Sequence, residues 1–272
     1  MGLIDKAKVR SAFNRQADRY EDSAVVQKRV VARIAGSLRN EWSAVNPGRV
    51  LDIGAGTGML LNAVRTIFPT AFIAGLDLAP GMSRSALVAL QGKGGAIVVE
   101  GDAERLPFAD GSFDLVLSTS TYQWLNVLET AFSEVYRVLS PGGVFRFALF
   151  GESTLVELRA SYRKALSAGK QVVEDRTHRF FSEQEVKHAM ESAGLSECVT
   201  ESSLEREYHA DVPALLRSLR DIGAGNASAF VGRGLAGRKI MLTMMDAYLN
   251  DYGERDGIPA TYEVVYGKGI RS

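Results

Sequence analysis

The chain has little cysteine and histidine, and it has no long uncharged apolar run. Its 272 residues include one cysteine, Cys198, and three histidines. A single cysteine cannot form an internal disulfide, and no paired Cys or His spacing predicts a metal site, so we expect a reducing compartment, the cytoplasm. No apolar run approaches the roughly 18 residues of a membrane span, and the charged start at Asp5, Lys6 and Lys8 is unlike a signal peptide. Export and membrane anchoring are therefore not expected.

An excess of charge of either sign is also missing. There are 32 basic and 32 acidic residues, and 46% of the chain is hydrophobic, which is typical of an ordinary globular protein. Net charge zero argues against general attraction to nucleic acid. The charge is nevertheless uneven, because residues 1–40 hold nine basic side chains against four acids and residues 213–245 hold five against one. These stretches are either solvated helix faces or a surface for an acidic partner.

Short apolar runs alternate with helical stretches in the middle of the sequence, a pattern typical of a parallel sheet covered by helices. The expected strands are residues 49–53, 72–76, 96–99, 114–118 and 143–150. The expected helices are residues 58–68, 80–90 and 127–139, the last followed by a helix stop and a turn at residues 140–143. The pattern predicts an α/β fold with a doubly wound, mostly parallel sheet, whose core is residues 46–150.

Helical periodicity before and after this core predicts further elements of the same domain. Residues 1–45 are expected to form an N-terminal helical cap. In residues 151–272, we expect helices at 154–166 and 182–193 and strands at 197–208 and 260–270. A helical insertion near 210–256, with helices at 212–222 and 235–252, is expected before the last strand.

The first expected strand ends in a glycine-rich turn, Gly54-Ala55-Gly56-Thr57-Gly58, preceded by Asp52. Glycines allow a ligand to approach the backbone closely, at the edge where open α/β sheets bind ligands. The third glycine follows two residues after the second, and Met59 stands where a dinucleotide fingerprint has glycine, which argues against NAD or FAD. Asp52 is interpreted as a residue beside the ligand rather than a polar strand end.

Asp77 follows the second expected strand, where its two oxygens can accept both hydroxyls of a ribose. The alternative is a helix N-cap before Pro80. This position indicates a nucleoside ligand without naming it.

Four motifs in order then carry a family resemblance. They are VLDIGAGTG, GLDLAPGM, GDAERLPFADGSFDLVLS and YRVLSPGG. Across residues 49–150 they resemble the class I S-adenosylmethionine-dependent methyltransferases, which have a Rossmann-like fold. The resemblance implies that Asp102 accepts the adenine amino group, Ala103 offers its amide, and Leu78 and Met82 enclose the base. It also implies that Gly54 and Gly56 contact the methionine part, with Ser118 near the transferred methyl.

The flanking segments resemble a narrower family, the malonyl-[acyl-carrier protein] O-methyltransferases of biotin synthesis. The segments are FNRQADRY, YQWL, STLVEL, HRF, RSLRDIGA and TY near the end. This resemblance implies methylation of the free carboxylate of a malonyl thioester on acyl carrier protein, giving the ester that starts pimeloyl formation. Arg220 stands where a lysine is expected in many relatives, which keeps the charge but changes the donor geometry.

A carboxylate is already ionised at pH 7 and a sulfonium methyl is already activated, so methyl ester formation needs no general base. Tyr20 is expected as an aromatic lid, Gln123 as the amide that orients the carboxylate, and Trp124 as a wall against water. Core packing is the alternative for each. Arg179 is expected as the cation of the acceptor pocket, with a surface arginine as the alternative. His178 is expected as a surface or packing residue rather than a base.

The basic insertion would suit an acidic carrier protein, through Arg217, Arg220, Arg233, Arg238 and Lys239. Three other functions stay open at this point. They are a methyltransferase acting on a small acid or a quinone precursor, a non-catalytic S-adenosylmethionine-binding module, and a nicotinamide enzyme.

Overall fold

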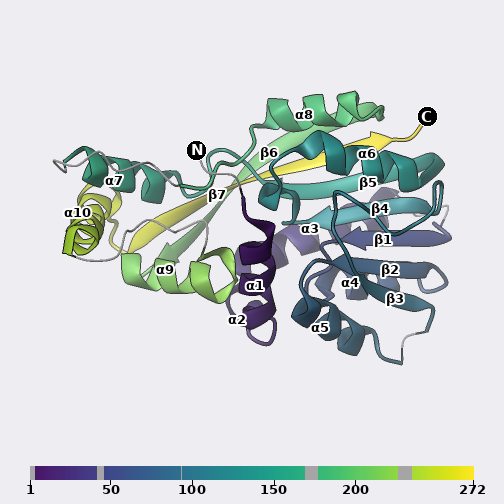
Figure 1. The fold of residues 1–272 in the computed structure, drawn as a ribbon, viewed down its shortest axis with the longest axis horizontal. Helices are drawn as coiled ribbons and strands as arrows, with labels where there is room; N and C mark the ends of the chain where they lie inside the picture. Colours follow the sequence, from purple (N-terminus) through teal and green to yellow (C-terminus); the bar gives the residue numbers. More distant parts are fainter. Residues whose placement is uncertain (1–3, 42–45, 93, 169–176, 226–234) are drawn as a thin grey trace.

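The computed structural model describes residues 4–41, 46–92, 94–168, 177–225 and 235–272 as one sheet flanked by helices (Figure 1). The seven-stranded sheet has the order β3-β2-β1-β4-β5-β7-β6. Its strands are β1 Arg49–Ile53, β2 Phe72–Asp77, β3 Ala96–Glu100, β4 Phe113–Thr119, β5 Leu139–Phe150, β6 Ser196–His209 and β7 Ile258–Ile270. Strands β1 to β5 are parallel, and β7 runs antiparallel to both β5 and β6. The predicted doubly wound, mostly parallel sheet is confirmed.

Ten α-helices and one 3-10 helix are found in the described residues. They are α1 Lys6–Gln16, α2 Tyr20–Ser23, α3 Val25–Glu41, α4 Met59–Ile67, α5 Pro80–Leu90, η1 Tyr122–Trp124, α6 Leu128–Val138, α7 Val156–Ser167, α8 Glu183–Ser192, α9 Val212–Asp221 and α10 Leu235–Tyr252. Each helix predicted from periodicity is present, within about two residues at its ends. The turn expected at residues 140–143 is wrong, because β5 already begins at Leu139 and pairs with Phe113 before a register shift.

The two faces of the sheet are covered by different helices because side chains alternate along each strand. Val50 and Leu115 pack in one hydrophobic cluster with residues of α3, α4 and α5. Leu51 and Val116 pack in a second cluster with residues of α6 and α8. Both faces of the central strands are thereby buried, as the continuous apolar runs of a parallel sheet require.

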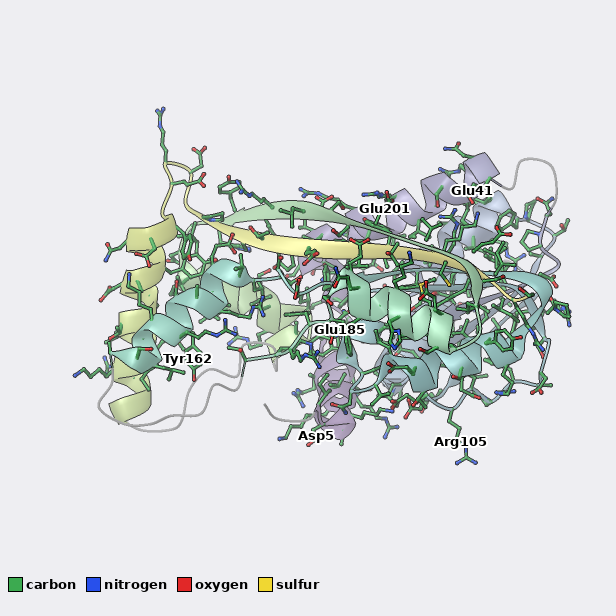
Figure 2. All side chains as sticks on the ribbon, turned by 90° about the horizontal axis from the view of Figure 1, so that it is seen from above. Asp5, Glu41, Arg105, Tyr162, Glu185 and Glu201 are labelled. Atoms are coloured by element: carbon green, nitrogen blue, oxygen red, sulfur yellow. The ribbon has the colours of Figure 1, made fainter. Side chains whose placement is uncertain are left out.

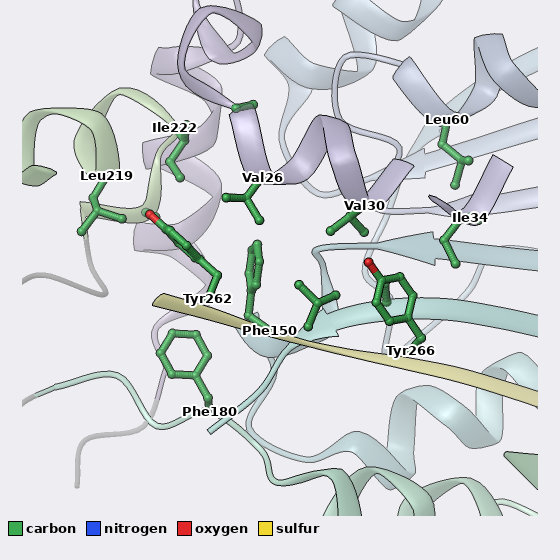
Figure 3. Close-up of a cluster of buried hydrophobic side chains, with 14 of the residues drawn as sticks. Val26, Val30, Ile34, Leu60, Phe150, Phe180, Leu219, Ile222, Tyr262 and Tyr266 are labelled. Carbon is green, nitrogen blue, oxygen red and sulfur yellow. The ribbon is translucent and has the colours of Figure 1, made fainter. Parts of the chain in front are cut away.

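Strands β6 and β7 form a long antiparallel pair that extends beyond the rest of the sheet to α7 and α10 (Figures 1 and 2). Helices α9 and α10 lie between these strands in sequence and occupy this end of the molecule. At the junction of the two ends, Phe150, Phe180 and Tyr262 gather with residues of α3 and α9 (Figure 3). The insertion therefore shares a hydrophobic core with the half of the molecule that contains β1 to β5.

The basic side chains of residues 1–40 are largely engaged within the molecule. Lys6 Nζ lies 2.6 Å from Asp102 Oδ2, and Arg10 Nη2 lies 3.7 Å from Glu100 Oε2. Arg29 and Arg33 on α3 pair with glutamates of β6. This basic stretch thus joins the N-terminal helices to the sheet rather than presenting a uniformly positive surface. In the described parts of the chain, no helix is both long and apolar enough to cross a membrane.

Candidate active site

A cavity of about 750 Å³ opens at the carboxyl ends of the parallel strands, where the strand order reverses between β1 and β4. The lining residues include predicted positions from three of the four motifs, namely Gly54, Gly56, Asp77, Leu78, Met82, Asp102 and Ala103. The cavity is termed the cofactor cavity below.

The glycine-rich turn has left-handed backbone angles that favour glycine, with φ of 75° at Gly54 and 55° at Gly56. A Cβ at Gly54 would lie 1.9 Å from Thr121 Oγ1, whereas a Cβ at Gly56 would meet nothing within 4 Å. Gly54 is therefore required for packing against the end of β4. Gly56 instead leaves the cavity open to a ligand.

Asp77 lines the cofactor cavity and is anchored by backbone amides. Its Oδ2 accepts from Gly56 N at 2.9 Å, and its Oδ1 accepts from Ala79 N at 2.8 Å. Burial raises the pKa of the Asp77 carboxyl, and the amides of Ala79, Gly56 and Leu78 oppose that rise. The N-cap alternative is wrong, because Ala79 is the N-cap residue of α5 and no side chain caps that helix. Asp77 instead stabilises the turn before α5 and lines the cavity, and its contact with a ribose stays a prediction.

Asp52 and Ala55 lie just outside the lining of this cavity. Asp52 is 1% exposed, and its Oδ1 has no hydrogen-bond partner among the described residues. Burial, followed by the neighbouring charge of Asp77, raises the pKa of Asp52 to about 8. Ala55 is buried and donates its amide to Leu76 O at 2.9 Å.

Asp102 lies on the opposite wall and is held by Lys6 of α1. Lys6 Nζ donates to Asp102 Oδ1 at 2.8 Å and also pairs with Glu104. Lys6, Val9, Arg10 and Phe13 all line the cofactor cavity, so α1 covers it. These covering residues were missed because only the segment from Phe13 onward carries a motif, and basic side chains on an exposed helix give no distinct signal.

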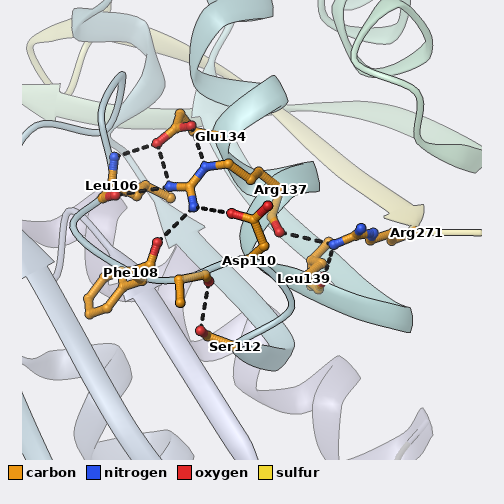
Figure 4. Close-up of polar contacts among 9 residues, drawn as sticks. Leu106, Phe108, Asp110, Ser112, Glu134, Arg137, Leu139 and Arg271 are labelled. Atoms are coloured by element: carbon orange, nitrogen blue, oxygen red, sulfur yellow. Dashed lines mark hydrogen bonds and ion pairs between the residues drawn. The ribbon is translucent and has the colours of Figure 1, made fainter.

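The loop that follows Asp102 is fixed from behind by Arg137 of α6 (Figure 4). Its guanidinium donates to Phe108 O at 2.7 Å and to Leu106 O at 3.0 Å, and it pairs with Asp110 and Glu134. The Arg137 contact lowers the pKa of Glu134. Such multiple charged hydrogen bonds hold the cavity wall in one position.

A second cavity of about 430 Å³, termed the acceptor cavity, adjoins the first. Phe13, Tyr20, Ser120 and Trp124 line both cavities. The other lining residues are Gln27, Gln123, Phe150, Thr154, Leu155, Phe180, Leu219, Ile222, Ala224 and Tyr262. No described lining residue of the acceptor cavity carries a charge. Two of them, Ser120 and Leu155, have positive φ of 55° and 54° without being glycine, a type of strain that gathers at functional sites.

The predicted acceptor residues Tyr20, Gln123 and Trp124 all lie at this second cavity. Tyr20 and Trp124 each flank the ring of Phe13, with ring centroids 6.3 Å and 5.5 Å away. Burial raises the pKa of Tyr20. Gln123 is 2% exposed, and its amide donates to Ser120 O at 2.7 Å and accepts from Phe150 N at 3.5 Å.

Two predicted positions are corrected. Ser118 is fully buried and donates its hydroxyl to Ile53 O at 2.7 Å, because strand alternation turns it beneath the sheet edge while Thr119, Ser120 and Thr121 line the cofactor cavity. Arg179 is exposed, pairs with Glu185 and lies outside the acceptor cavity. The extended segment buries His178 and Phe180 and directs the side chain between them to solvent.

His178 is a buried packing residue rather than a surface one. Its Nε2 lies 2.9 Å from Gln123 O, and its ring centroid lies 5.0 Å from that of Trp124. Burial lowers the pKa of His178 to about 4, and the nearby charge of Arg159 acts in the same direction. The neutral ring therefore donates from Nε2 to the carbonyl and supports the turn that carries Gln123 and Trp124.

The predicted docking residues Arg217 and Arg220 are exposed on α9, and Arg238 and Lys239 are exposed on α10. Arg220 Nε lies 3.6 Å from Asp221. Arg233 lies outside the described residues. Leu219 and Ile222 at the same end of the molecule line the acceptor cavity, so the basic side chains stand on the outer side of its wall.

The residues of the cofactor cavity fit S-adenosylmethionine. Gly56 has no Cβ to fill the space beside it, Asp77 offers carboxylate oxygens, and Leu78, Met82 and Ala103 give apolar walls for a base. In the described residues, no group of acidic, His and Cys side chains could hold a metal ion.

Comparison with known proteins agrees with this geometry. Residues 51–147 match the family model described as a methyltransferase domain. A malonyl-[acyl-carrier protein] O-methyltransferase of Geobacter sulfurreducens is 52% identical and covers 99% of this chain and 100% of its own. One of the same name from Laribacter hongkongensis is 38% identical and covers 98% of this chain and 90% of its own.

The fold has relatives among solved structures. A SAM-dependent methyltransferase of Thermotoga maritima, named as a possible histamine N-methyltransferase, superposes with a TM-score of 0.55 at 20% identity. The match covers 96% of this chain and 99% of that one. Its similarity concerns the fold alone. The sequence relatives, which match almost from end to end, show that this chain belongs to the malonyl-[acyl-carrier protein] O-methyltransferase family.

Proposed function

We propose that this enzyme methylates the free carboxylate of a malonyl thioester carried by acyl carrier protein. S-adenosylmethionine, when bound, supplies an activated methyl group. The observation that carries the proposal is the pair of adjoining cavities, which share Phe13, Tyr20, Ser120 and Trp124. A donor in the first cavity and an acceptor in the second would lie next to each other where these four residues line both cavities. Their proximity would provide a large part of the rate acceleration.

The chemistry of the acceptor cavity favours a carboxylate over other acceptors. Its described lining contains no His, Asp, Glu, Lys or Cys, and burial raises the pKa of both tyrosines, Tyr20 and Tyr262. No group is therefore poised to remove a proton near neutral pH. Methylation at carbon or at a phenol of a quinone precursor needs such a base, whereas an ionised carboxylate does not.

The apolar lining also suits the charge change in the reaction. A carboxylate and a sulfonium react to give a neutral ester and a neutral thioether, so charge disperses in the transition state. Phe150, Phe180 and Trp124 exclude water that would otherwise stabilise the separated charges. The ester formed would be the malonyl methyl ester that the sequence resemblance places at the start of pimeloyl formation for biotin.

The experiment is a transfer assay with labelled methyl from S-adenosylmethionine. Malonyl carrier protein, malonyl coenzyme A and free malonate are offered in parallel, and the product is treated with mild base. We expect the highest kcat/KM with the carrier protein and release of labelled methanol by base. Label that resists base would indicate carbon methylation, and cofactor binding without transfer to any acceptor would indicate a non-catalytic module.

A further inference from the structure

One polar side chain in the acceptor cavity has no role in the fold. Gln27, in the first turn of α3, is 6% exposed and lines this cavity. Its amide has no hydrogen-bond partner among the described residues, and its nitrogen and oxygen are not among the fully enclosed unpartnered atoms, so they are open to the cavity. An amide in this position can donate to and accept from a ligand that enters the cavity.

The residues around Gln27 are mostly apolar. On the same helix, Val26, Val30 and Ile34 belong to the main hydrophobic cluster (Figure 3). A methionine or leucine at position 27 would continue the apolar lining made by Phe150 and Leu155. The amide therefore points to a ligand in the cavity rather than to packing.

Gln123, the amide that the sequence favours for the acceptor, is already engaged. Its amide nitrogen donates to Ser120 O and its oxygen accepts from Phe150 N. These bonds fix the turn after β4 and engage one of the two N–H groups of Gln123. Gln27 is the side-chain amide in the described lining whose N–H groups and oxygen are all unengaged.

We infer that Gln27 binds the acceptor carboxylate, with its Nε2–H donating to the oxygen that is not methylated. This inference deepens the proposed function and rests on it. A carboxylate is the strongest hydrogen-bond acceptor of a malonyl thioester. A neutral amide orients it without a fixed positive charge, which would hold the carboxylate more tightly in the ground state than in the transition state.

The test compares Gln27→Met and Gln27→Glu with the wild type. Gln27→Met keeps the side-chain length but removes the donor, and it should raise KM for malonyl carrier protein about 10- to 100-fold, the loss expected for a hydrogen bond to a charged group. Cofactor Kd from calorimetry should stay within twofold of wild type. Gln91→Met, at an exposed glutamine after α5, is the matched control and should leave KM unchanged.

Gln27→Glu adds a readout that a structural role would not affect. A buried glutamate has a raised pKa, so it repels the carboxylate when ionised and can donate a hydrogen bond when protonated. Its KM should therefore fall as the pH is lowered from 8 to 6, while the KM of the wild type stays nearly constant. A pH-independent KM in Gln27→Glu would overturn the inference.

Acetyl carrier protein, which lacks the carboxylate, separates the two parts of the substrate. As an inhibitor it should bind wild type and Gln27→Met equally. Equal weakening of acetyl and malonyl carrier proteins would instead assign Gln27 to the thioester carbonyl and overturn the inference. If the wild type forms no base-labile ester from malonyl carrier protein, the proposed function is wrong. This outcome is measured on the wild type alone, so it is distinct from the result for Gln27→Met.

Discussion

Gly54 and Gly56 have different tasks although both have positive φ. A Cβ at Gly54 would collide with Thr121, while a Cβ at Gly56 would project into open space. The first glycine therefore serves the packing of the fold, and the second serves the ligand.

Gly54→Ala should lower the free energy of unfolding by about 2–4 kcal/mol, through overpacking and strain. Gly56→Ala should cost only about 1–2 kcal/mol of backbone strain but should weaken S-adenosylmethionine binding. Urea denaturation and calorimetric titration of both variants check these outcomes. Equal stability of the two variants would contradict the assignment.

His178 makes the acceptor turn sensitive to acid. Its pKa of about 4 in the folded state is below the ordinary 6.5. Between these two pH values the unfolded chain therefore binds a proton that the native ring does not bind. Its stabilising effect is complete above pH 6.5 and is lost as the pH falls from 6.5 to 4.

His178→Phe should remove this dependence while keeping a ring beside Trp124. The variant leaves the carbonyl of Gln123 without its donor, so at pH 7.5 it should be less stable by about 1–3 kcal/mol. The difference in Tm between pH 7.5 and pH 5 should be smaller in the variant than in the wild type. A variant with an unchanged pH dependence would show that His178 does not titrate in this range.

At the scale of elements, α9 has two faces with different chemistry. Its inner face places Leu219 at the acceptor cavity, and its outer face carries Arg217 and Arg220. Of the two basic stretches, this one is less neutralised, since the pairs of Lys6, Arg10, Arg29 and Arg33 engage the first. We therefore propose that an acidic carrier protein docks on α9 and α10.

Reversing Arg217 and Arg220 to Glu should raise KM for malonyl carrier protein, most strongly at low salt, since exposed charges act mainly on encounter. Turnover of a small malonyl thioester and the affinity for the cofactor should stay unchanged. Arg84→Glu, on α5, which lies on the far side of α1 from α9, is the control (Figure 1). If the double variant impaired both substrates equally, the outer face of α9 would not be a docking site.

Elements could be predicted well because hydrophobic periodicity within one segment determines each of them. The cofactor cavity could be predicted through its motifs, since each motif ends a strand at the same sheet edge. The acceptor cavity could not, because residues from Phe13 to Tyr262 meet there through tertiary packing. Gln27 belongs to no motif. Arg179 lies in an extended segment, and the sequence does not show which face of that segment is buried.

For the stability of the whole molecule, Asp52 and His178 have opposite pH dependences. The Asp52 pKa of about 8, against an ordinary 3.8, means that the native state keeps a proton which the unfolded chain releases. The contribution of Asp52 to the free energy of unfolding is fully present below pH 3.8 and is lost as the pH rises through about 8.

Asp52→Asn should therefore reduce the loss of stability between pH 6 and pH 8 in the ligand-free protein. At pH 8 the variant should be more stable than the wild type by about 1–3 kcal/mol, because a buried ionised carboxyl is avoided. Thermal unfolding at both pH values measures this. A steeper decline in the variant would mean that the carboxylate is stabilised by contacts in the folded protein.

The uncharged lining of the acceptor cavity has a thermodynamic consequence for both ligands. An arriving carboxylate finds no cation among the described lining residues, so its affinity depends on the charge of the molecule beside it. Linkage then requires that each ligand tighten the other by the same factor, about 5- to 150-fold for a coupling of 1–3 kcal/mol. Carrier protein should bind more tightly with an unreactive, positively charged cofactor analogue than with the neutral demethylated cofactor. Methyl transfer itself would thus remove the attraction that assembled the complex and favour release of both products.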